Sequence, residues 1–471
     1  MKTVTELSNI PSVDELLSDP AIAELTEEFG RERALRYVRD AVANVRSRVL
    51  KKESPDAGSR ESLRTAALTE AAASAHAERK NGLRRVINAT GVVIHTNLGR
   101  APMSSRAVEA MTEAAGYSTI EYDIAKGRRG TRGGKVISSI EMLTGAEAAI
   151  VVNNCAAAAF LILSAFARGH EVIVSRGELV EIGGDFRIPD VLERSGAVLK
   201  EVGTTNRTHL RDYAEAINDK TAMLLKVHPS NFRISGFTKA PETRELAKLA
   251  HERGVIFFED AGSGALNDMS SIGIRNEPVI REIIAAGADL VSFSGDKLLG
   301  GPQCGIIAGR RDLVDSLARD PLFRALRVDK TITAALEATL ESYLSGRHEK
   351  ELPVLRMLGL DEASIARRSD VFAKELVRHL TKDDGWTIEV VKSVSAAGGG
   401  TSPDAELATA AIALSYSGLS EGEIESRLRL ASPPVIARID AGRVLIDLRT
   451  VSEKDEAELL NAIIGQEWEP M

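Results

Sequence analysis

Short apolar runs alternate with longer amphipathic stretches from residue 86 to about residue 330. The apolar runs predict strands at 148–152, 171–175, 197–202, 222–227, 255–259, 290–293 and 305–307. Strands that alternate with helices along a chain pair mostly in parallel, and the helices cover both faces of the sheet. We therefore predict a large α/β domain over 86–330, in which ligands lie beyond the carboxyl ends of the strands.

Residues 1–85 follow a different, purely helical pattern. Ser12, with Glu15 three residues later, predicts a capped helix start. A longer helix then carries one apolar stripe at steps of three and four residues, formed by Leu35, Val38, Val42, Val45 and Val49. Breakers at 54–59 precede an alanine-rich helix at 61–80. The pattern predicts a separate helical module.

The spacing of the apolar runs loosens after about Thr331. The alternating segments 434–440 and 443–449 flank a short turn and predict a hairpin. Residues 453–464 predict a helix that covers this hairpin. We therefore expect a small α+β domain over 331–471.

Composition narrows the class of protein. A length of 471 residues allows two or three domains, and a net charge of −8 means that a nucleic acid would need a local basic patch. The two cysteines, Cys155 and Cys304, cannot form a disulfide framework and fit a reducing cytosol. The first residues lack the apolar core of a signal peptide, and the longest apolar run is too short for a bilayer. We expect a cytoplasmic protein. The histidines form no close set with acids or cysteines, so we expect no metal site.

A lysine between two predicted strands is the candidate reactive group. Lys297 follows the apolar run that ends at Phe293 and precedes the pair Gly300 and Gly301. Desolvation lowers the pKa of an ammonium group, and the free amine can then form a Schiff base. Pyridoxal-phosphate enzymes hold their cofactor in this way. A lysine that only closes a surface turn fits the same residues.

A pyridoxal-phosphate site also needs a phosphate anchor and a carboxylate for the pyridine nitrogen. The turn at Asn154 and Cys155 follows a strand and opens a helix, whose free N–H groups attract an anion. Ser294 adds a hydroxyl group close to Lys297. Asp260 ends a predicted buried strand and is the candidate carboxylate, although helix caps and turns use aspartate as well. All these parts are expected at one edge of the sheet, which favours the cofactor site.

Two basic segments and one glycine-rich run remain. The helix that carries the apolar stripe has an excess of arginine on its other faces; a solvated helix face explains this excess, and contact with RNA phosphates is the functional alternative. Residues 126–135 resemble a phosphate-binding loop in composition only, because Arg129 and Val136 replace its glycine and hydroxyl. We interpret 126–135 and 397–400 as mobile loops, the first of them a possible anion or RNA contact.

Several segments resemble one known family, bacterial selenocysteine synthase. They cover nearly the whole chain: 87–91, 95–100, 174–184, 201–208, 292–305, 323–330 and 434–449. The resemblance implies fold type I of the pyridoxal-phosphate enzymes, with Lys297 as the cofactor lysine. It also implies conversion of L-seryl-tRNA(Sec) to L-selenocysteinyl-tRNA(Sec) with selenophosphate, through an aminoacrylyl intermediate, for selenocysteine incorporation into proteins.

The resemblance assigns further roles. Arg100, Arg324 and Arg327 lie in matching segments, and we expect them to hold the phosphate-bearing selenium donor. The last two are three residues apart and would share a helix face, where solvated arginines are also common. The resemblance implies that the amino-terminal module recognises the tRNA by its shape and that the protein assembles as a ring of dimers, a decamer. Cys155 and Cys304 stand where other small or polar residues are expected.

Two other functions are compatible with parts of the sequence. One is a related pyridoxal-phosphate lyase that eliminates water or ammonia from a small phosphorylated substrate. We expect such a lyase to lack the module over 1–85, so the module favours the tRNA enzyme. The other is an RNA-binding protein with a decayed site, which Lys297 and Asp260 argue against.

Overall fold

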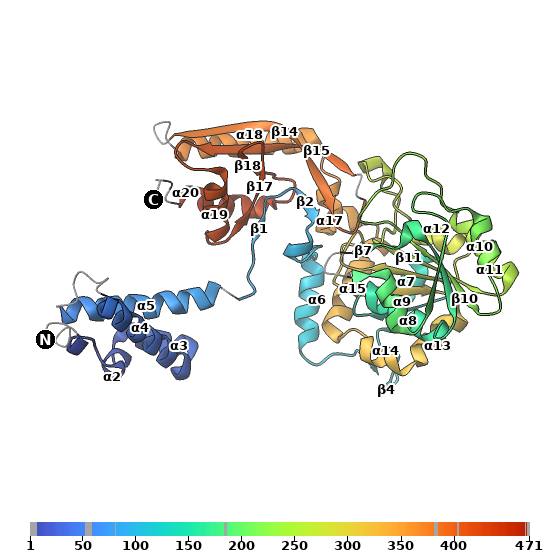
Figure 1. Cartoon of the computed structure of the whole chain (residues 1–471), viewed down its shortest axis with the longest axis horizontal. Helices are drawn as coiled ribbons and strands as arrows, with labels where there is room; N and C mark the ends of the chain where they lie inside the picture. The colour runs from blue at the N-terminus through green and yellow to red at the C-terminus, as the bar shows by residue number, and fades with distance from the viewer. Residues whose placement is uncertain are drawn as a thin grey trace. The chain divides into compact units, whose positions relative to one another are not determined.

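The computed structural model describes residues 7–51, 59–80, 82–182, 186–380, 385–402, 405–466 and 468. The chain forms two compact units, Met1–Arg85 and Val86–Met471 (Figure 1). The breakers at 54–58 lie outside the described residues. None of the described helices is both long enough and apolar enough to cross a membrane.

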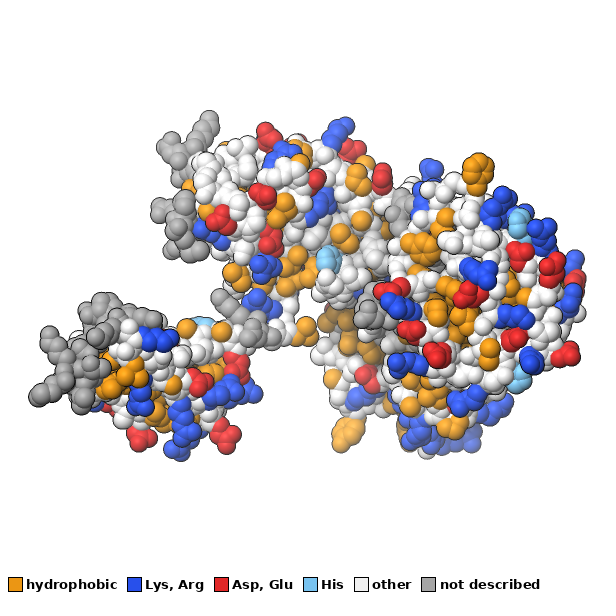
Figure 2. All heavy atoms as spheres, in the orientation of Figure 1, with side chains coloured by type: hydrophobic (Ala, Val, Ile, Leu, Met, Phe, Trp, Pro, Cys, Tyr) orange, Lys and Arg blue, Asp and Glu red, His pale blue; other side chains and the backbone are white. Residues whose placement is uncertain are grey.

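The N-terminal unit is helical, as predicted. Its helices are α2 (Val13–Leu17), α3 (Pro20–Phe29), α4 (Arg31–Lys51) and α5 (Arg60–Lys80). Ser12 caps α2 by accepting a hydrogen bond from the backbone N–H of Glu15. The apolar stripe of α4 is buried from Val38 to Val49 and packs with small alanines of α5, whereas Leu35 is half-buried. Figure 2 shows basic and acidic side chains mixed over the surface of this unit.

A seven-stranded sheet forms the centre of the second unit. In the order β5-β13-β12-β11-β10-β6-β9 it contains Ala148–Val152, Gly305–Gly309, Leu290–Ser294, Ile256–Gly262, Thr221–Val227, Glu171–Ser175 and Val198–Val202. All seven predicted strands are therefore present, and the mostly parallel sheet is confirmed. Only β13 is antiparallel to its neighbours in this sheet, because residues 295–304 join it to β12 without a crossover helix.

Helices cover both faces of this sheet. One face carries α8 (Cys155–Phe166), α9 (Ile188–Ser195) and α13 (Arg311–Arg319). The opposite face carries α7 (Gly134–Thr144), α11 (Thr243–Arg253), α12 (Ile280–Ala285) and α15 (Lys330–Leu344). The strands are buried on both sides, which explains their nearly continuous apolar sequences.

A second sheet has the order β17-β18-β15-β14-β2 and a core of its own. Its C-terminal strands are β14 (Trp386–Gly398), β15 (Glu406–Tyr416), β17 (Arg438–Asp440) and β18 (Arg443–Ile446), packed against α18 (Glu362–His379), α19 (Glu421–Leu430) and α20 (Glu456–Ile464). The hairpin is confirmed as β17 and β18. The alternation in 434–440 also predicted one apolar face with Val435, Ala437 and Ile439, and this prediction is wrong, because Val435 pairs with Ile87 outside the hairpin and Ile439 is 47% exposed.

The first two strands of this unit belong with the C-terminal elements. Strand β1 (Ile87–Asn88) pairs with β16 (Val435–Ile436), and β2 (Val92–Ile94) pairs with the end of β14. The predicted domain boundary at residue 86 placed both strands in the large α/β domain. The structure differs because these strands supply backbone partners to the C-terminal strands before the chain enters the large domain.

Candidate active site

Lys297 lies in the turn between β12 and β13, at the carboxyl end of β12. It is 7% exposed, and its side chain makes no hydrogen bond or ion pair within the described part of the chain. Glycine backbones lie on two sides of the amine: a Cβ built on Gly262 would be 4.0 Å from Nζ, and one built on Gly400 would be 2.6 Å from it. The amine is thus confined without being neutralised by a close carboxylate.

Asp260 is a buried carboxylate near the end of β11. Its Oδ1 accepts hydrogen bonds from Ser292 Oγ at 2.9 Å and from Cys155 Sγ at 3.2 Å. Burial raises the pKa of Asp260, and the two donors and the Lys297 amine partly offset that rise. A cationic group placed against Asp260 would favour its ionised form, as a protonated pyridine nitrogen would.

The turn before α8 is built as the sequence predicts, and the Cys155 thiol makes a contact that the sequence did not indicate. Asn154 caps the helix, since its side chain accepts from the backbone N–H of Ala157 at 2.8 Å. The thiol of Cys155 points to Asp260, and burial together with the Asp260 charge raises its pKa well above the usual range. Cys155 is therefore a protonated donor to Asp260, and its backbone N–H, at the first position of the helix, is what it can offer an anion.

Ser294 and Arg100 flank Lys297 from different segments. Ser294 is a buried residue that ends β12, three positions before the lysine. Arg100 has φ +63°, and its Nη1 lies 2.7 Å from Oδ2 of Asp296, the residue that precedes Lys297. The ion pair with Asp296 thus holds Arg100 close to Lys297.

The two remaining arginines do not share a helix face, so this prediction is wrong. Helix α14 (Pro321–Leu326) includes Arg324 in its last turn, where the side chain is exposed. Arg327 lies beyond the helix in extended conformation and bridges to Val152. The helix ends there because the Leu326 carbonyl accepts from the N–H of Asn153 at 2.9 Å. That contact places Arg327 beside the turn at Asn154.

Sequence reasoning missed a cluster of arginines around Glu121. This carboxylate pairs with Arg129 and Arg132 at 2.9 Å and with Arg327 at 3.7 Å. The hydrogen bond from Arg132 is the main cause that lowers the pKa of Glu121. Arg129 and Arg132 belong to the basic segment 126–135, which was expected to be a loop. It instead includes β4 (Arg128–Arg129), which pairs with β3 (Tyr122–Asp123), and the start of α7. Figure 2 shows basic side chains at the lower part of the large domain, where Figure 1 labels β4 and α14.

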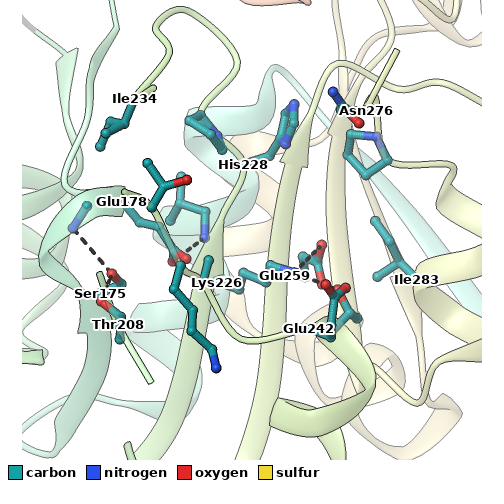
Figure 3. Close-up of a pocket in the computed structure, with 18 of the residues that line it drawn as sticks. Ser175, Glu178, Thr208, Lys226, His228, Ile234, Glu242, Glu259, Asn276 and Ile283 are labelled. Carbon is teal, nitrogen blue, oxygen red and sulfur yellow. Dashed lines mark hydrogen bonds and ion pairs between the residues drawn. The ribbon is translucent and has the colours of Figure 1, made fainter. Parts of the chain in front are cut away.

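A separate cavity of about 1270 Å³ contains neither Lys297 nor Asp260 (Figure 3). It is lined by Glu178, whose pKa burial raises to about 8, and by Glu259, which accepts from Thr243 of α11. Glu259 and Asp260 are neighbours in β11 and so point to opposite faces of the sheet. This cavity has buried carboxylates, but none of its lining residues is a buried lysine without a hydrogen-bond partner in the described part of the chain, as Lys297 is. We therefore choose the surroundings of Lys297 as the candidate site. The described residues contain no group of three potential metal ligands.

A solved structure shares this fold. The structure titled "Structure of D-Glucosaminate-6-phosphate Ammonia-lyase" is 21% identical with a TM-score of 0.56, and the match covers 83% of this chain and 97% of that chain. The chain therefore has the fold known as fold type I of the pyridoxal-phosphate enzymes. In this fold Lys297 lies in the turn after a central strand, near the buried Asp260 and the N-terminus of α8.

Sequence comparison identifies the family within this class. Residues 86–452 match the family described as L-seryl-tRNA selenium transferase. Residues 7–46 match the family described as selenocysteine synthase N terminal. The L-seryl-tRNA(Sec) selenium transferase of Geobacter sulfurreducens is 46% identical over 98% of this chain and 99% of its own length. That of Hyphomonas neptunium is 46% identical over 97% and 98%. The chain belongs to the L-seryl-tRNA selenium transferase family.

Proposed function

We propose that this protein converts L-seryl-tRNA(Sec) to L-selenocysteinyl-tRNA(Sec), with pyridoxal 5'-phosphate at Lys297 and selenophosphate as the selenium donor. The observation that carries the proposal is the meeting of three parts at one sheet edge: the confined Lys297 amine, the buried Asp260 and the N-terminus of α8. Membership of the selenium transferase family supports the substrate.

The residues present suit the cofactor. Asp260 is buried with a raised pKa, and a protonated ring nitrogen would compensate its charge. The N–H groups at Asn154 and Cys155 would bind the phosphate. When bound, pyridoxal phosphate supplies an electron sink for the α-carbon of the seryl group. The Lys297 amine would then remove the α-proton, and the β-hydroxyl group of the seryl residue would leave as water. Selenium from selenophosphate would add at the β-carbon with release of phosphate, and the α-carbon would take up a proton from the Lys297 ammonium group.

Three arginines would hold the selenium donor. Arg100 lies next to the lysine through Asp296, and Arg327 lies next to the phosphate-binding turn. Arg324 is exposed on the preceding helix turn and is free to reach an anion. Planar guanidinium groups match the oxygens of a phosphate. Loss of Arg324 should therefore slow selenium transfer more than it weakens cofactor binding.

The N-terminal unit would bind the tRNA. On α4, Arg39 and Arg46 are exposed, lack a hydrogen bond or ion pair in the described part of the chain, and are two helical turns apart on one face. Such cations attract phosphates of a structured RNA. We also propose that the protein forms a ring of dimers, a decamer, and that it is cytoplasmic. The family resemblance supports the decamer, and the two free cysteines fit the cytoplasmic location.

One assay tests the proposal directly. Purified protein is incubated with seryl-tRNA(Sec) and selenophosphate, and selenocysteinyl-tRNA(Sec) is measured for the wild type, Arg324→Ala and Lys297→Ala. We expect product with the wild type, slower formation with Arg324→Ala at unchanged cofactor absorbance, and none with Lys297→Ala. Absence of product with a wild type that contains the cofactor would contradict the proposed reaction and favour the lyase.

A further inference from the structure

The turn that follows strand β14 packs against the Lys297 amine. A Cβ atom built on Gly400 would lie 2.6 Å from Lys297 Nζ and 3.0 Å from its Cε. Such contacts are closer than real Cβ atoms tolerate, so the missing side chain of Gly400 leaves the space that the amine occupies. Gly400 is buried and has φ +74°, in the left-handed region. The run 397–400 therefore forms a wall of the lysine site. This packing explains its glycines without the mobile loop that the sequence suggested.

This wall is held on both sides of the glycine run. Ala397 before it and Leu407 after it lie in the same core as Leu298 and Leu299, the residues that follow Lys297. Strand β2 runs alongside, with Gly398 paired to Ile94 and no room for a Cβ between them. The position of Gly400 is thus determined by packing that includes the turn of Lys297 itself.

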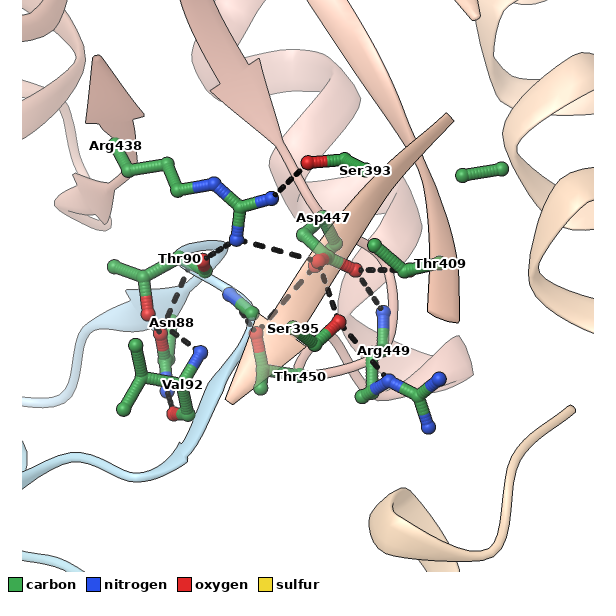
Figure 4. Close-up of polar contacts among 12 residues, drawn as sticks. Asn88, Thr90, Val92, Ser393, Ser395, Thr409, Arg438, Asp447, Arg449 and Thr450 are labelled. Carbon is green, nitrogen blue, oxygen red and sulfur yellow. Dashed lines mark hydrogen bonds and ion pairs between the residues drawn. The ribbon is translucent and has the colours of Figure 1, made fainter. Parts of the chain in front are cut away.

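A buried polar network holds the same strands farther from the lysine (Figure 4). Asp447 is fully buried and accepts hydrogen bonds from Ser395 of β14 at 2.7 Å and from Thr409 of β15 at 3.0 Å. Arg438 lies 3.5 Å from Asp447 and donates to the carbonyl oxygen of Thr90, just before β2. Strands β14, β15 and β2 therefore keep one relative position, which keeps Gly400 against the amine.

We propose that Gly400 is a positioning residue for Lys297, an inference that rests on the proposed role of Lys297 as the cofactor lysine. Because Gly400 has no side chain, the turn at the end of the C-terminal sheet can approach the amine closely and confine it. A methyl group there would displace Nζ rather than the backbone, because Nζ is the free end of a flexible side chain. The C-terminal part of the chain thereby shapes the site without supplying a reacting group.

The first experiment compares two glycine variants as holoenzymes. Gly400→Ala introduces both the left-handed strain and the contact with Lys297. Gly442→Ala is the matched control, because Gly442 has φ +72° and nothing within 4 Å of its built Cβ. Overpacking typically weakens the affected state about tenfold to a hundredfold, so we expect cofactor retention to fall by this factor in Gly400→Ala. We also expect a shifted pH midpoint of the lysine–cofactor absorption band, and neither change in Gly442→Ala.

A second experiment keeps the inference testable if Gly400→Ala folds poorly. Thermal unfolding is measured for the wild type, Gly400→Ala, Lys297→Ala and the double variant. If the methyl group collides with the lysine, Gly400→Ala lowers the melting temperature much less in the Lys297→Ala background than in the wild type. Equal decreases in both backgrounds would overturn the inference.

The outcomes separate this inference from the proposed function. A wild-type protein without a lysine–cofactor absorption band contradicts the proposed function itself. A normal band in the wild type, with the same retention and pH midpoint in Gly400→Ala as in the wild type, overturns only the role of Gly400. Equal changes in Gly400→Ala and Gly442→Ala also overturn it, since backbone strain alone would then explain them.

Discussion

The N-terminal unit and the 86–471 unit differ in how deeply they enclose charged side chains. In the N-terminal unit, pairs such as Arg48 and Glu70 lie near the surface, with side chains that are 44% and 25% exposed. The 86–471 unit has surface pairs as well, such as Arg187 and Glu181, but it also encloses charged groups in its interior: Asp447 and Arg449 are 0% and 2% exposed. Water screens the first kind of pair, whereas a buried group must find its partners inside the protein.

The difference separates two tasks. Surface arginines on α4 can exchange their partners for RNA phosphates at little cost to folding, because exposed ion pairs contribute little to stability. Buried groups such as Asp260 and Asp447 have fixed neighbours, and they hold geometry that a reaction needs. We therefore expect substitutions in the two units to have different consequences.

The largest expected effect is the loss of cofactor chemistry in Lys297→Ala. The absorption band of the lysine–cofactor link should disappear, because the amine is its covalent partner. Binding of tRNA should stay unchanged, because the N-terminal unit carries its own core. Visible absorbance and a tRNA binding assay measure the two effects. A band that persists in this variant would exclude Lys297 as the cofactor lysine.

Deletion of residues 1–80 should have the converse effect. We expect tRNA affinity to fall about a hundredfold or more, since several phosphate contacts would be lost. The absorption band of the lysine–cofactor link should be retained, because Lys297 and Asp260 belong to the second unit. Affinity is measured at fixed salt, with the full chain as the control. Full-strength tRNA binding by the shortened protein would move the RNA site into the 86–471 unit.

Asp447→Ala tests the buried network. Removing one partner of a buried charged network typically costs about 3–5 kcal/mol, because the remaining groups lose their compensation. We expect the free energy of unfolding of the second unit to fall by this amount, as measured in denaturant. Asp440→Ala is the control, since Asp440 is an exposed residue of the same hairpin. Equal stability of the two variants would show that the network contributes nothing.

Glu178→Gln should change how stability depends on pH. Burial raises the pKa of Glu178 from 4.5 to about 8, so the folded protein binds a proton that the unfolded chain releases. The wild type therefore loses stability as the pH rises from 4.5 through about 8, and glutamine should remove this loss. Unfolding measured at both ends of this interval checks it. A variant with an unchanged pH profile would contradict the raised pKa.

The smallest effect is expected for Arg48→Ala in the N-terminal unit. Its ion pair with Glu70 is partly exposed, and such pairs contribute about 1 kcal/mol or less. Denaturant unfolding of the full chain should show a change within this range. A loss as large as that of Asp447→Ala would remove the distinction between the two units.

Local sequence patterns were sufficient for most of the fold. Apolar residues that recur at steps of two, or of three and four, indicate which side chains of a strand or helix are buried. All seven strands of the large sheet and the apolar stripe of α4 could therefore be predicted. The order of small residues, strand and lysine likewise indicated Lys297, Asp260 and the turn at Asn154. These features depend on neighbours within a few residues of each other.

Only the tertiary structure decided which distant residues meet. The end of α14 depends on a hydrogen bond from Asn153 to Leu326, which is why Arg327 leaves the helix. The pairing of Glu121 with three arginines, of β2 with β14, and of Gly400 with Lys297 likewise joins segments far apart in the chain. The sequence by itself determined the elements and indicated Lys297 as the candidate reactive group, because periodicity and local chemistry encode them. Long-range packing decided the partners, because chain closure and the filling of space select them only when all elements are assembled.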